Sequence, residues 1–208
     1  MKSFSYNDII RNLSTKKIPV KKRLKNLAEI QSGFYVRTDG DWDISYLQAK
    51  NFDEFGDLKE KLVPEIKSEN TQERQLLQEW DILFSAKWTR NFATVYKEEY
   101  WKCIASSTFF VIRIKDKSIL PEYLAILINE SQWTSYFKNS FSGGTIQSIS
   151  KQVLEEFEVY IPPKEKQEQT IQLYNLYKKQ LHIYKQLKTQ KEALMNKIVL
   201  HTNSKKHD

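Results

Sequence analysis

The chain has 208 residues, which fits one domain of about 150 to 160 residues with an appendage and argues against a tandem of full-sized domains. Hydrophobic residues make up 40% of the chain and aromatic residues 13%, with only 5 Gly and 5 Pro, so we expect a folded protein rather than a disordered or fibrous one. The net charge of +7 points to a polyanionic partner.

Cysteine content and the length of the apolar runs bear on the compartment. Because Cys103 is the only cysteine, a disulfide framework is excluded and a reducing compartment is the simplest interpretation. The longest apolar runs, 108–112 and 123–128, are far shorter than the roughly 20 residues of a membrane span, and the polar N-terminus carries no secretory signal. We therefore expect a cytoplasmic protein with no membrane contact.

The positive charge is concentrated at the two ends. Residues 1–25 carry 8 Lys and Arg against one acidic residue, and residues 164–208 carry 10 Lys against 4 acidic residues. The middle, residues 26–163, carries 15 basic and 21 acidic residues, so DNA contact there depends on a few placed cations. The basic run between Lys16 and Lys25 is either a solvated terminus or an arm that contacts phosphates.

The first half of the chain predicts short strands after one short helix. Cap candidates Ser5 and Asn7 precede apolar residues at helical spacing over 9–13. From Leu27 the pattern becomes β-rich and predicts a mixed, mostly antiparallel sheet, whereas the charged stretch 53–80 is expected to be irregular. The predicted strands are 27–30, 33–36, 44–47, 82–85, 92–96, 103–107 and 108–114.

Helical and strand signals alternate in the next part of the chain. Pro121 opens a helix whose apolar residues continue at helical spacing to Ile128, and the aromatic residues of 133–137 extend that stripe. Ser150 begins another short helix. The strand 157–161 ends at Pro162 and Pro163, because proline lacks the amide donor.

Residues 164–201 contain no Gly or Pro and predict one helix about 50 Å long at 1.5 Å per residue. Residues recur along it at steps of four and three, the spacing of a coiled coil, with polar interruptions at Gln180 and Lys191. Such a helix needs a partner to bury its apolar face, which Leu176, Leu181 and Ile183 widen on the flanks. The predicted dimerisation seam is Leu173, Tyr177, Gln180, Tyr184, Leu187, Lys191, Leu194 and Ile198.

These elements together predict an α+β fold, with a β-rich globular domain at 1–163 and one long coiled-coil helix at 164–201. The basic segment 1–25 belongs to the domain, and we expect 202–208 to be a disordered tail.

Familiar catalytic motifs are missing from the sequence. Gly143 and Gly144 precede Thr-Ile-Gln rather than the Lys-Ser/Thr of a phosphate loop, and all three histidines lie in the terminal helix or tail. One pattern, Asp53 with Glu65 and Lys67, fits the loose spacing of magnesium-dependent nucleases. Because Glu65 follows a proline among polar residues, we expect a solvated loop there, and we predict no catalytic residue and no metal site.

Two segments combine side chains suited to DNA with a loop context. In 87–91, Arg suits guanine, Asn suits adenine, and Lys and Thr suit phosphates or base edges. In 143–147, paired glycines permit close approach to a phosphate beside two hydrogen-bonding side chains. Taken alone, each segment is equally an ordinary polar loop or turn. The candidate DNA-contact residues are Lys87, Thr89, Arg90, Asn91, Gly143, Gly144, Thr145 and Gln147.

The order of segments resembles the specificity subunit of a type I restriction-modification system, in a half-length form with a single target recognition domain. The resemblance runs from about Arg23 to His201, and its strength lies in the ordered series of motifs. Trp80 departs from it, because the family commonly has Gly before Asp-Ile-Leu, so the local turn is expected to differ. The motifs are Leu27–Gly33, Tyr46–Phe52, Asp81–Ser85, Arg90–Ala93, Ala105–Ser107, Leu120–Leu124, Gly144–Gln147 with Ile149-Ser150, Val159–Pro163 and Gln167–Gln169.

The resemblance implies a subunit without catalysis of its own. It would read double-stranded DNA and hold methyltransferase (modification) subunits that bind S-adenosylmethionine and, in some assemblies, a translocating restriction subunit. By position it assigns DNA contact to 87–91 and 143–147, with Arg37 and Thr38 as further candidates. Family members usually carry two recognition domains and two helices, whereas this chain has one of each. A homodimer through the seam, or pairing with another specificity chain, restores two, and two identical domains imply an interrupted palindromic target.

Two other functions stay open from the residues alone. A protein-interaction adaptor that uses the terminal helix predicts no salt-dependent binding to duplex DNA, whereas DNA recognition predicts affinity that falls steeply with salt. A nuclease predicts magnesium-dependent cutting that Glu65→Ala abolishes.

Overall fold

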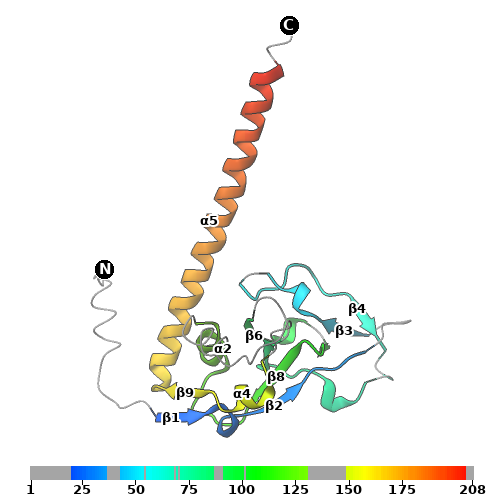
Figure 1. Ribbon diagram of the computed structural model, residues 1–208, viewed down its shortest axis with the longest axis vertical. Coiled ribbons are helices and arrows are strands. Elements are labelled where there is room, and N and C mark those ends of the chain that lie inside the picture. Colours follow the sequence, from blue (N-terminus) through cyan, green and yellow to red (C-terminus); the bar gives the residue numbers. More distant parts are fainter. Residues whose placement is uncertain are drawn as a thin grey trace. The chain divides into compact units, whose positions relative to one another are not determined.

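Among the residues that the structure describes, short strands form three small sheets in the first of two units of the chain, Met1–Gln169 (Figure 1). The second unit, Thr170–Asp208, contains most of the long terminal helix. The computed structural model describes residues 20–36, 43–53, 55–67, 69, 71–86, 91–100, 102–130 and 149–204. Within these residues, no helix is long and apolar enough to cross a membrane.

The largest sheet has the order β2-β8-β5-β6, and all its neighbours are antiparallel. Its strands are β2 (Ala28–Ser32), β5 (Ile82–Ser85), β6 (Ala93–Val95) and β8 (Phe109–Ile114). Every residue of β5 and the first four of β8 are buried, as expected for central strands covered on both faces. Leu83, Phe109 and Val111 contribute to the main apolar core, with Phe52 and Phe92 packed edge-on against Phe109.

A second sheet has the order β4-β3-β7, in which β3 (Ile44–Leu47) is antiparallel to β4 (Pro64–Ile66) and parallel to β7 (Cys103–Ala105). The prediction of an irregular 53–80 with a solvated loop around Glu65 was wrong for β4. Ile66 is almost fully buried in a small core with Ile44, and this burial makes the polar segment a strand. Pro64 is tolerated because β4 lies at the edge of its sheet.

The third sheet joins β1 (Val20–Arg23) to β9 (Glu158–Ile161) in antiparallel register. Its basic residues lie beside acidic ones: Lys21 pairs with Glu158, Lys22 with Asp116 at 2.6 Å, and Arg23 with Glu156 at 3.0 Å. From Val20 to Arg23, the basic run is therefore an exposed but ordered strand rather than a frayed terminus. The rest of that run and the helix predicted over 9–13 lie outside the described residues.

The helices confirm the expected order of elements. α2 (Pro121–Asn129) begins with proline in its first turn, and α4 (Lys151–Glu155) begins at Ser150, whose Oγ accepts a hydrogen bond from Val153 N at 3.2 Å. The predicted strand 33–36 is reduced to one bridge, between Phe34 and Ser106. Residues 133–137 lie outside the described part of the chain. Short 3-10 turns are η1 (Leu24–Asn26), η2 (Ala49–Asn51), η4 (Glu73–Gln75) and η5 (Glu98–Tyr100).

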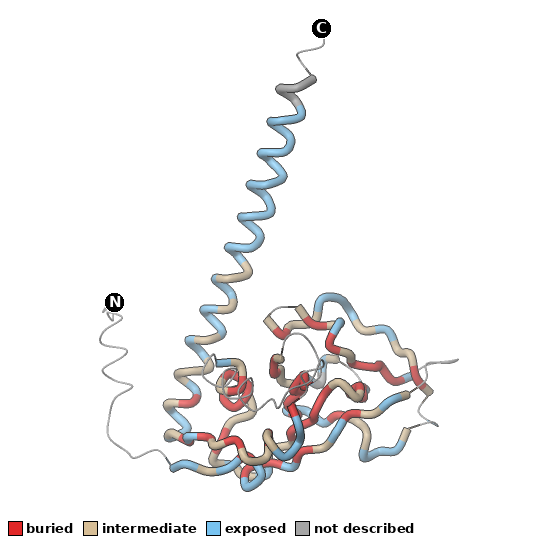
Figure 2. Tube along the Cα trace, in the orientation of Figure 1, coloured by how far each residue is buried: buried red, intermediate tan, exposed pale blue. Residues whose placement is uncertain are grey.

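The terminal helix α5 (Lys164–Ser204) has 41 residues, or about 60 Å at 1.5 Å per residue. It begins directly after Pro162 and Pro163, as predicted. Figure 2 shows that the described residues beyond its first turns are mostly exposed. The predicted α+β class with a β-rich domain and one long helix is confirmed.

Candidate nucleic-acid interface

The residues on the two sides of the segment 87–90 are hydrogen-bonded to each other. Ser85 N donates to Phe92 O at 2.8 Å, and Asn91 Nδ2 donates to Ser85 O at 2.8 Å. One amide hydrogen of Asn91 is therefore engaged within the protein, whereas its contact with DNA stays a prediction. Lys87, Thr89 and Arg90 lie outside the described residues.

The described residues on either side of 131–148, the stretch that contains the second predicted segment, bond to residues that flank 87–90. Before it, the Asn129 side chain at the end of α2 accepts from Ala93 N at 2.7 Å and donates to Ala93 O at 2.8 Å. After it, Ile149 N donates to Ala86 O at 3.1 Å. Ala86 and Ala93 flank the segment 87–90, so Asn129 and Ile149 both bond close to the point where β5 ends and β6 begins. Gly143, Gly144, Thr145 and Gln147 themselves lie outside the described residues.

The chain before the third candidate, Arg37 and Thr38, is also tightly placed, although those two residues are outside the described part. Gly33 N donates to Phe109 O and Phe34 N to Ala105 O, both at 2.9 Å. A Cβ at position 33 would lie 2.1 Å from the Ser106 carbonyl oxygen, so only glycine permits this approach.

A half-open hollow of about 710 Å³ adjoins these anchors. Val36 lines it, and so does Thr108, whose carbonyl oxygen accepts from Ala86 N at 3.0 Å. Tyr46 OH donates to Phe34 O at 2.8 Å, and burial raises the pKa of this phenol. The lining also includes Lys50, Glu65 and Tyr35, and Tyr35 is 78% exposed. The hollow therefore extends the candidate interface from Ala86 toward Val36.

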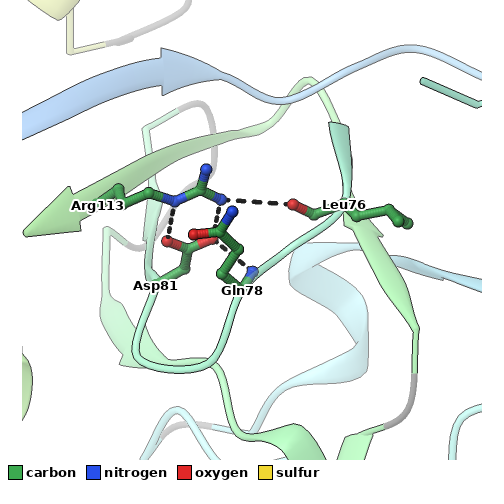
Figure 3. Close-up of polar contacts among 4 residues, drawn as sticks. All are labelled: Leu76, Gln78, Asp81 and Arg113. Atoms are coloured by element: carbon green, nitrogen blue, oxygen red, sulfur yellow. Dashed lines mark hydrogen bonds and ion pairs between the residues drawn. The ribbon is translucent and has the colours of Figure 1, made fainter. Parts of the chain in front are cut away.

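A buried ion pair braces the strand that leads to Ala86 (Figure 3). Arg113 donates from Nε to Asp81 Oδ1 at 2.8 Å and from Nη2 to Asp81 Oδ2 at 2.6 Å, and Gln78 N donates to the same Oδ2 at 2.8 Å. The hydrogen bonds to Asp81 raise the pKa of Arg113. Asp81, directly before β5, thus holds β5 to β8 through Arg113, whose Nη2 also donates to Leu76 O at 3.4 Å.

Trp80, the residue before this aspartate, has φ of 74°, the left-handed conformation that favours glycine. The turn therefore has a glycine-like backbone although the residue is tryptophan. Trp80 is 47% exposed.

Two residues of the nuclease pattern, Asp53 and Glu65, occupy positions that do not suit a nuclease site. Asp53 Oδ1 accepts from Phe55 N at 2.8 Å and Asp57 N at 3.0 Å, so it holds a turn. Glu65 belongs to the edge strand β4, not to a central buried strand. These positions do not match the arrangement on which the nuclease hypothesis depends.

The predicted dimerisation seam is exposed along α5. Its apolar members Leu173, Tyr177, Tyr184, Leu187, Leu194 and Ile198 are between 41% and 59% exposed. Gln180 Nε2 donates to Tyr184 OH at 3.4 Å, so one polar interruption contacts its seam neighbour. An apolar stripe of this kind is the surface that a coiled coil buries.

The sequence alone did not identify the residues whose hydrogen bonds hold the described ends of these segments. Asp81 follows Trp80 within a recognised motif and offered a signal, because an acidic residue beside a buried strand needs a partner. Asn129 and Ile149 act through backbone atoms of distant residues, and no spacing in the sequence reports such contacts.

The described part of the chain is an α+β domain, in which Asn129 and Ile149 bond to the residues that flank 87–90, followed by a long helix. The sequence matches the family described as type I restriction modification DNA specificity domain over residues 19–198, and the chain belongs to that family. A comparison with curated proteins finds no match.

Solved structures share the fold at low sequence identity. One, described as "Structural basis underlying complex assembly and conformational transition of the type I R-M system", is 16% identical with a TM-score of 0.66, over 89% of this chain and 44% of that chain. The HsdS subunit from Thermoanaerobacter tengcongensis is 16% identical with a TM-score of 0.56, over 81% of this chain and 40% of its own. The type I S subunit from M. genitalium is 12% identical with a TM-score of 0.51, over 78% of this chain and 40% of its own. The chain thus spans less than half the length of each.

Proposed function

We propose that this chain is the DNA specificity subunit of a type I restriction-modification system and does not itself catalyse a reaction. Residues 1–163 serve as the target recognition domain and 164–201 as a spacer and dimerisation helix. The observation that carries the proposal is the joining of the ends of 87–90 and 131–148 at Ala86 and Ala93. Two segments that are far apart in sequence then act on one stretch of DNA.

DNA affinity rests on a few cations rather than on the overall charge. Lys21, Lys22, Arg23 and Lys25 form ion pairs with acidic residues of the same chain, so the N-terminal surplus is partly neutralised. Lys87 and Arg90 are the foremost candidates for phosphate and base contact, and Lys50, which lines the hollow, is a further candidate. Each phosphate that such a cation neutralises contributes a slope of about −0.9 to log K against log salt.

Two copies of the chain pair through the exposed seam of α5. A two-fold dimer is self-complementary, so the same stripe serves on both helices. Its two identical recognition domains read the two halves of an interrupted palindrome.

The remaining apolar flank of α5 supports docking of further subunits. Leu176 and Ile183 lie beside the seam and are exposed. A stripe wider than a strict two-stranded seam is typical of a bundle with additional helices. Methyltransferase subunits, which bind S-adenosylmethionine, dock on this flank. A translocating restriction subunit joins in some assemblies. Because the target is cellular DNA, the assembly belongs in the cytoplasm.

The proposal is tested by sedimentation and by selection from random duplexes. At micromolar concentration we expect a dimer, which Leu187→Lys on the seam dissociates and Gln186→Lys, an exposed position off the seam, does not. The wild-type dimer is expected to enrich two inverted copies of one motif, with retention that falls steeply with salt.

A monomer at these concentrations would contradict the dimer, and a non-palindromic target would contradict its symmetry. A dimer that enriches no sequence would favour the adaptor. Magnesium-dependent cutting that Glu65→Ala abolishes would instead favour the nuclease.

A further inference from the structure

The hollow beside the candidate interface is lined by polar side chains that lie below the protein surface. Ser106 is only 4% exposed, and Gln48, Glu65 and Thr108 are half-buried. The space of about 710 Å³ falls within the range of about 300 to 1,000 Å³ that is typical of small-molecule sites. A recess with a few convergent polar groups is the ordinary form of such a site.

Three of these side chains have hydrogen-bonding capacity left for a ligand. Ser106 Oγ and Thr108 Oγ1 lie 2.6 Å apart, and their mutual bond uses the hydrogen of only one hydroxyl. Within the described residues, the Glu65 carboxylate has neither a hydrogen bond nor an ion pair. The hollow therefore offers one donor and one strong acceptor to a molecule that enters it.

The charge of the lining argues against a phosphate as the occupant. Lys50 and Glu65 contribute one charge of each sign. At a surface that meets DNA, a carboxylate repels the phosphates, and acidic side chains there suit the N–H groups of bases instead. A neutral ligand that both donates and accepts hydrogen bonds fits this lining, and a nucleobase is such a ligand.

A base that stays in the double helix does not reach these groups. Base edges lie at the floor of a major groove about 8.5 Å deep, so the side chains that read them protrude from the protein. Ser106 and Glu65 instead line a recess. Proteins that bind a base in a recess extrude it from the stack and cover its face with an aromatic or apolar side chain. Tyr35 lines the same hollow and, at 78% exposed, offers such a ring.

The hollow adjoins two of the predicted DNA segments. Thr108 O accepts from Ala86 N at 3.0 Å, and Ala86 directly precedes 87–90. Val36, which also lines the hollow, directly precedes the candidate segment 37–38. DNA that these segments contact therefore passes beside the hollow.

We propose that the hollow binds one nucleobase that leaves the double helix of the bound target, and that it favours a base with an exocyclic amino group. The inference rests on the proposed function, because the base belongs to the target that this chain reads. Glu65 accepts from the amino group, and the hydroxyl pair of Ser106 and Thr108 donates to a ring nitrogen or carbonyl oxygen. Tyr35 stacks on the base, and Lys50 contacts the phosphates of the same strand. Thymine, which has two carbonyl oxygens and no amino group, is disfavoured beside the carboxylate.

The test uses the full chain and the target that it enriches from random duplexes. The pairing partner of each motif base is replaced in turn by an abasic residue, and the affinity is measured by fluorescence anisotropy at one salt concentration. Glu65→Ala and Tyr35→Ala remove the acceptor and the ring. Glu60→Ala, an exposed glutamate outside the lining, is the matched control because it removes the same charge. A thermal melt of each variant verifies that it is folded.

In the wild type and in Glu60→Ala, unpairing one adenine, cytosine or guanine of each half-site is expected to raise the affinity about tenfold, because binding then breaks no base pair. Unpairing at the other positions is not expected to raise it. In Glu65→Ala and Tyr35→Ala the gain falls to about twofold or less. The gain compares two duplexes on the same protein, so a loss of folded protein alone leaves it unchanged.

Two outcomes overturn the inference and leave the proposed function intact: no position at which unpairing raises the affinity, or a gain that either variant retains. Binding of free adenosine, cytidine or guanosine, measured by titration calorimetry without any gain from unpairing, makes a free nucleoside the ligand and also overturns it. A wild type that enriches no target contradicts the proposed function itself, so the two failures are distinguishable.

Discussion

Asn129→Ala tests the anchor between the two predicted DNA segments. The Asn129 side chain bonds to both the N–H and the C=O of Ala93, at 2.7 and 2.8 Å. Ala93 belongs to β6, the last strand of its sheet, and is 3% exposed. The side chain therefore takes the place of a neighbouring strand at this edge.

The expected loss follows from the two bonds. Each contributes about 1 kcal/mol net, and a buried backbone group left without a partner costs about 1 to 3 kcal/mol. Asn129 is only half-buried, so water reaches part of the site, and we expect a loss of about 2 kcal/mol in the free energy of unfolding. For a chain of this size, that corresponds to a fall in Tm of about 4 to 8 °C.

Urea unfolding followed by tryptophan fluorescence is a suitable assay, because all five tryptophans lie between residues 42 and 133 and none lies in α5. Asn175→Ala, an exposed position of α5, is the matched control and should change stability by less than about 0.5 kcal/mol. Selection from random duplexes should show a weakened half-site motif with an unchanged spacer. A loss below about 0.5 kcal/mol in Asn129→Ala would refute the reasoning.

Three further predictions concern stability, each measured by the same unfolding assay. Asp81→Asn should lower the free energy of unfolding by about 2 to 3 kcal/mol, because it leaves Arg113 with weakened, partly buried hydrogen bonds. An unchanged free energy of unfolding would contradict a stabilising role for the Asp81–Arg113 ion pair. Trp80→Gly should be more stable than Trp80→Ala by about 1 kcal/mol, since φ is 74° there; equal stability would argue against a left-handed turn. The Lys22 ammonium lowers the pKa of the Asp116 carboxyl, so the stabilisation from this ion pair is present above the ordinary aspartate pKa and is lost as pH falls below about 4. Asp116→Asn should flatten this dependence of the free energy of unfolding on acid pH. An unchanged pH profile in the variant would contradict the contribution of the ion pair.

Elements with a local signal were predicted well. The strands 44–47 and 82–85 and the start of α2 at Pro121 lie where the pattern placed them, because alternation, apolar runs and proline act within a few residues. The start of α5 at Lys164 follows from two prolines and a helix-forming composition. In each case the neighbouring residues carry enough information.

Elements that depend on distant partners were missed. β1 is a run of basic residues that becomes a strand because β9, far along the chain, supplies both backbone partners and acidic side chains. β4 contains a proline and a glutamate and forms because Ile66 is buried beside Ile44. Local propensity opposes both strands, and only long-range pairing overrides it.

The candidate interface was likewise predicted in part from the sequence and decided in part by the tertiary structure. Residue chemistry alone directed attention to 87–91 and 143–147, since arginine, asparagine and paired glycines suit DNA wherever they occur. Only the tertiary structure showed that Asn129 and Ile149, on either side of 131–148, bond to the residues that flank 87–90. Composition and periodicity by themselves determined an α+β domain with a long helix, because they report local conformation. Which distant segments meet was decided by backbone hydrogen bonds and burial, whose partners the order of residues does not specify.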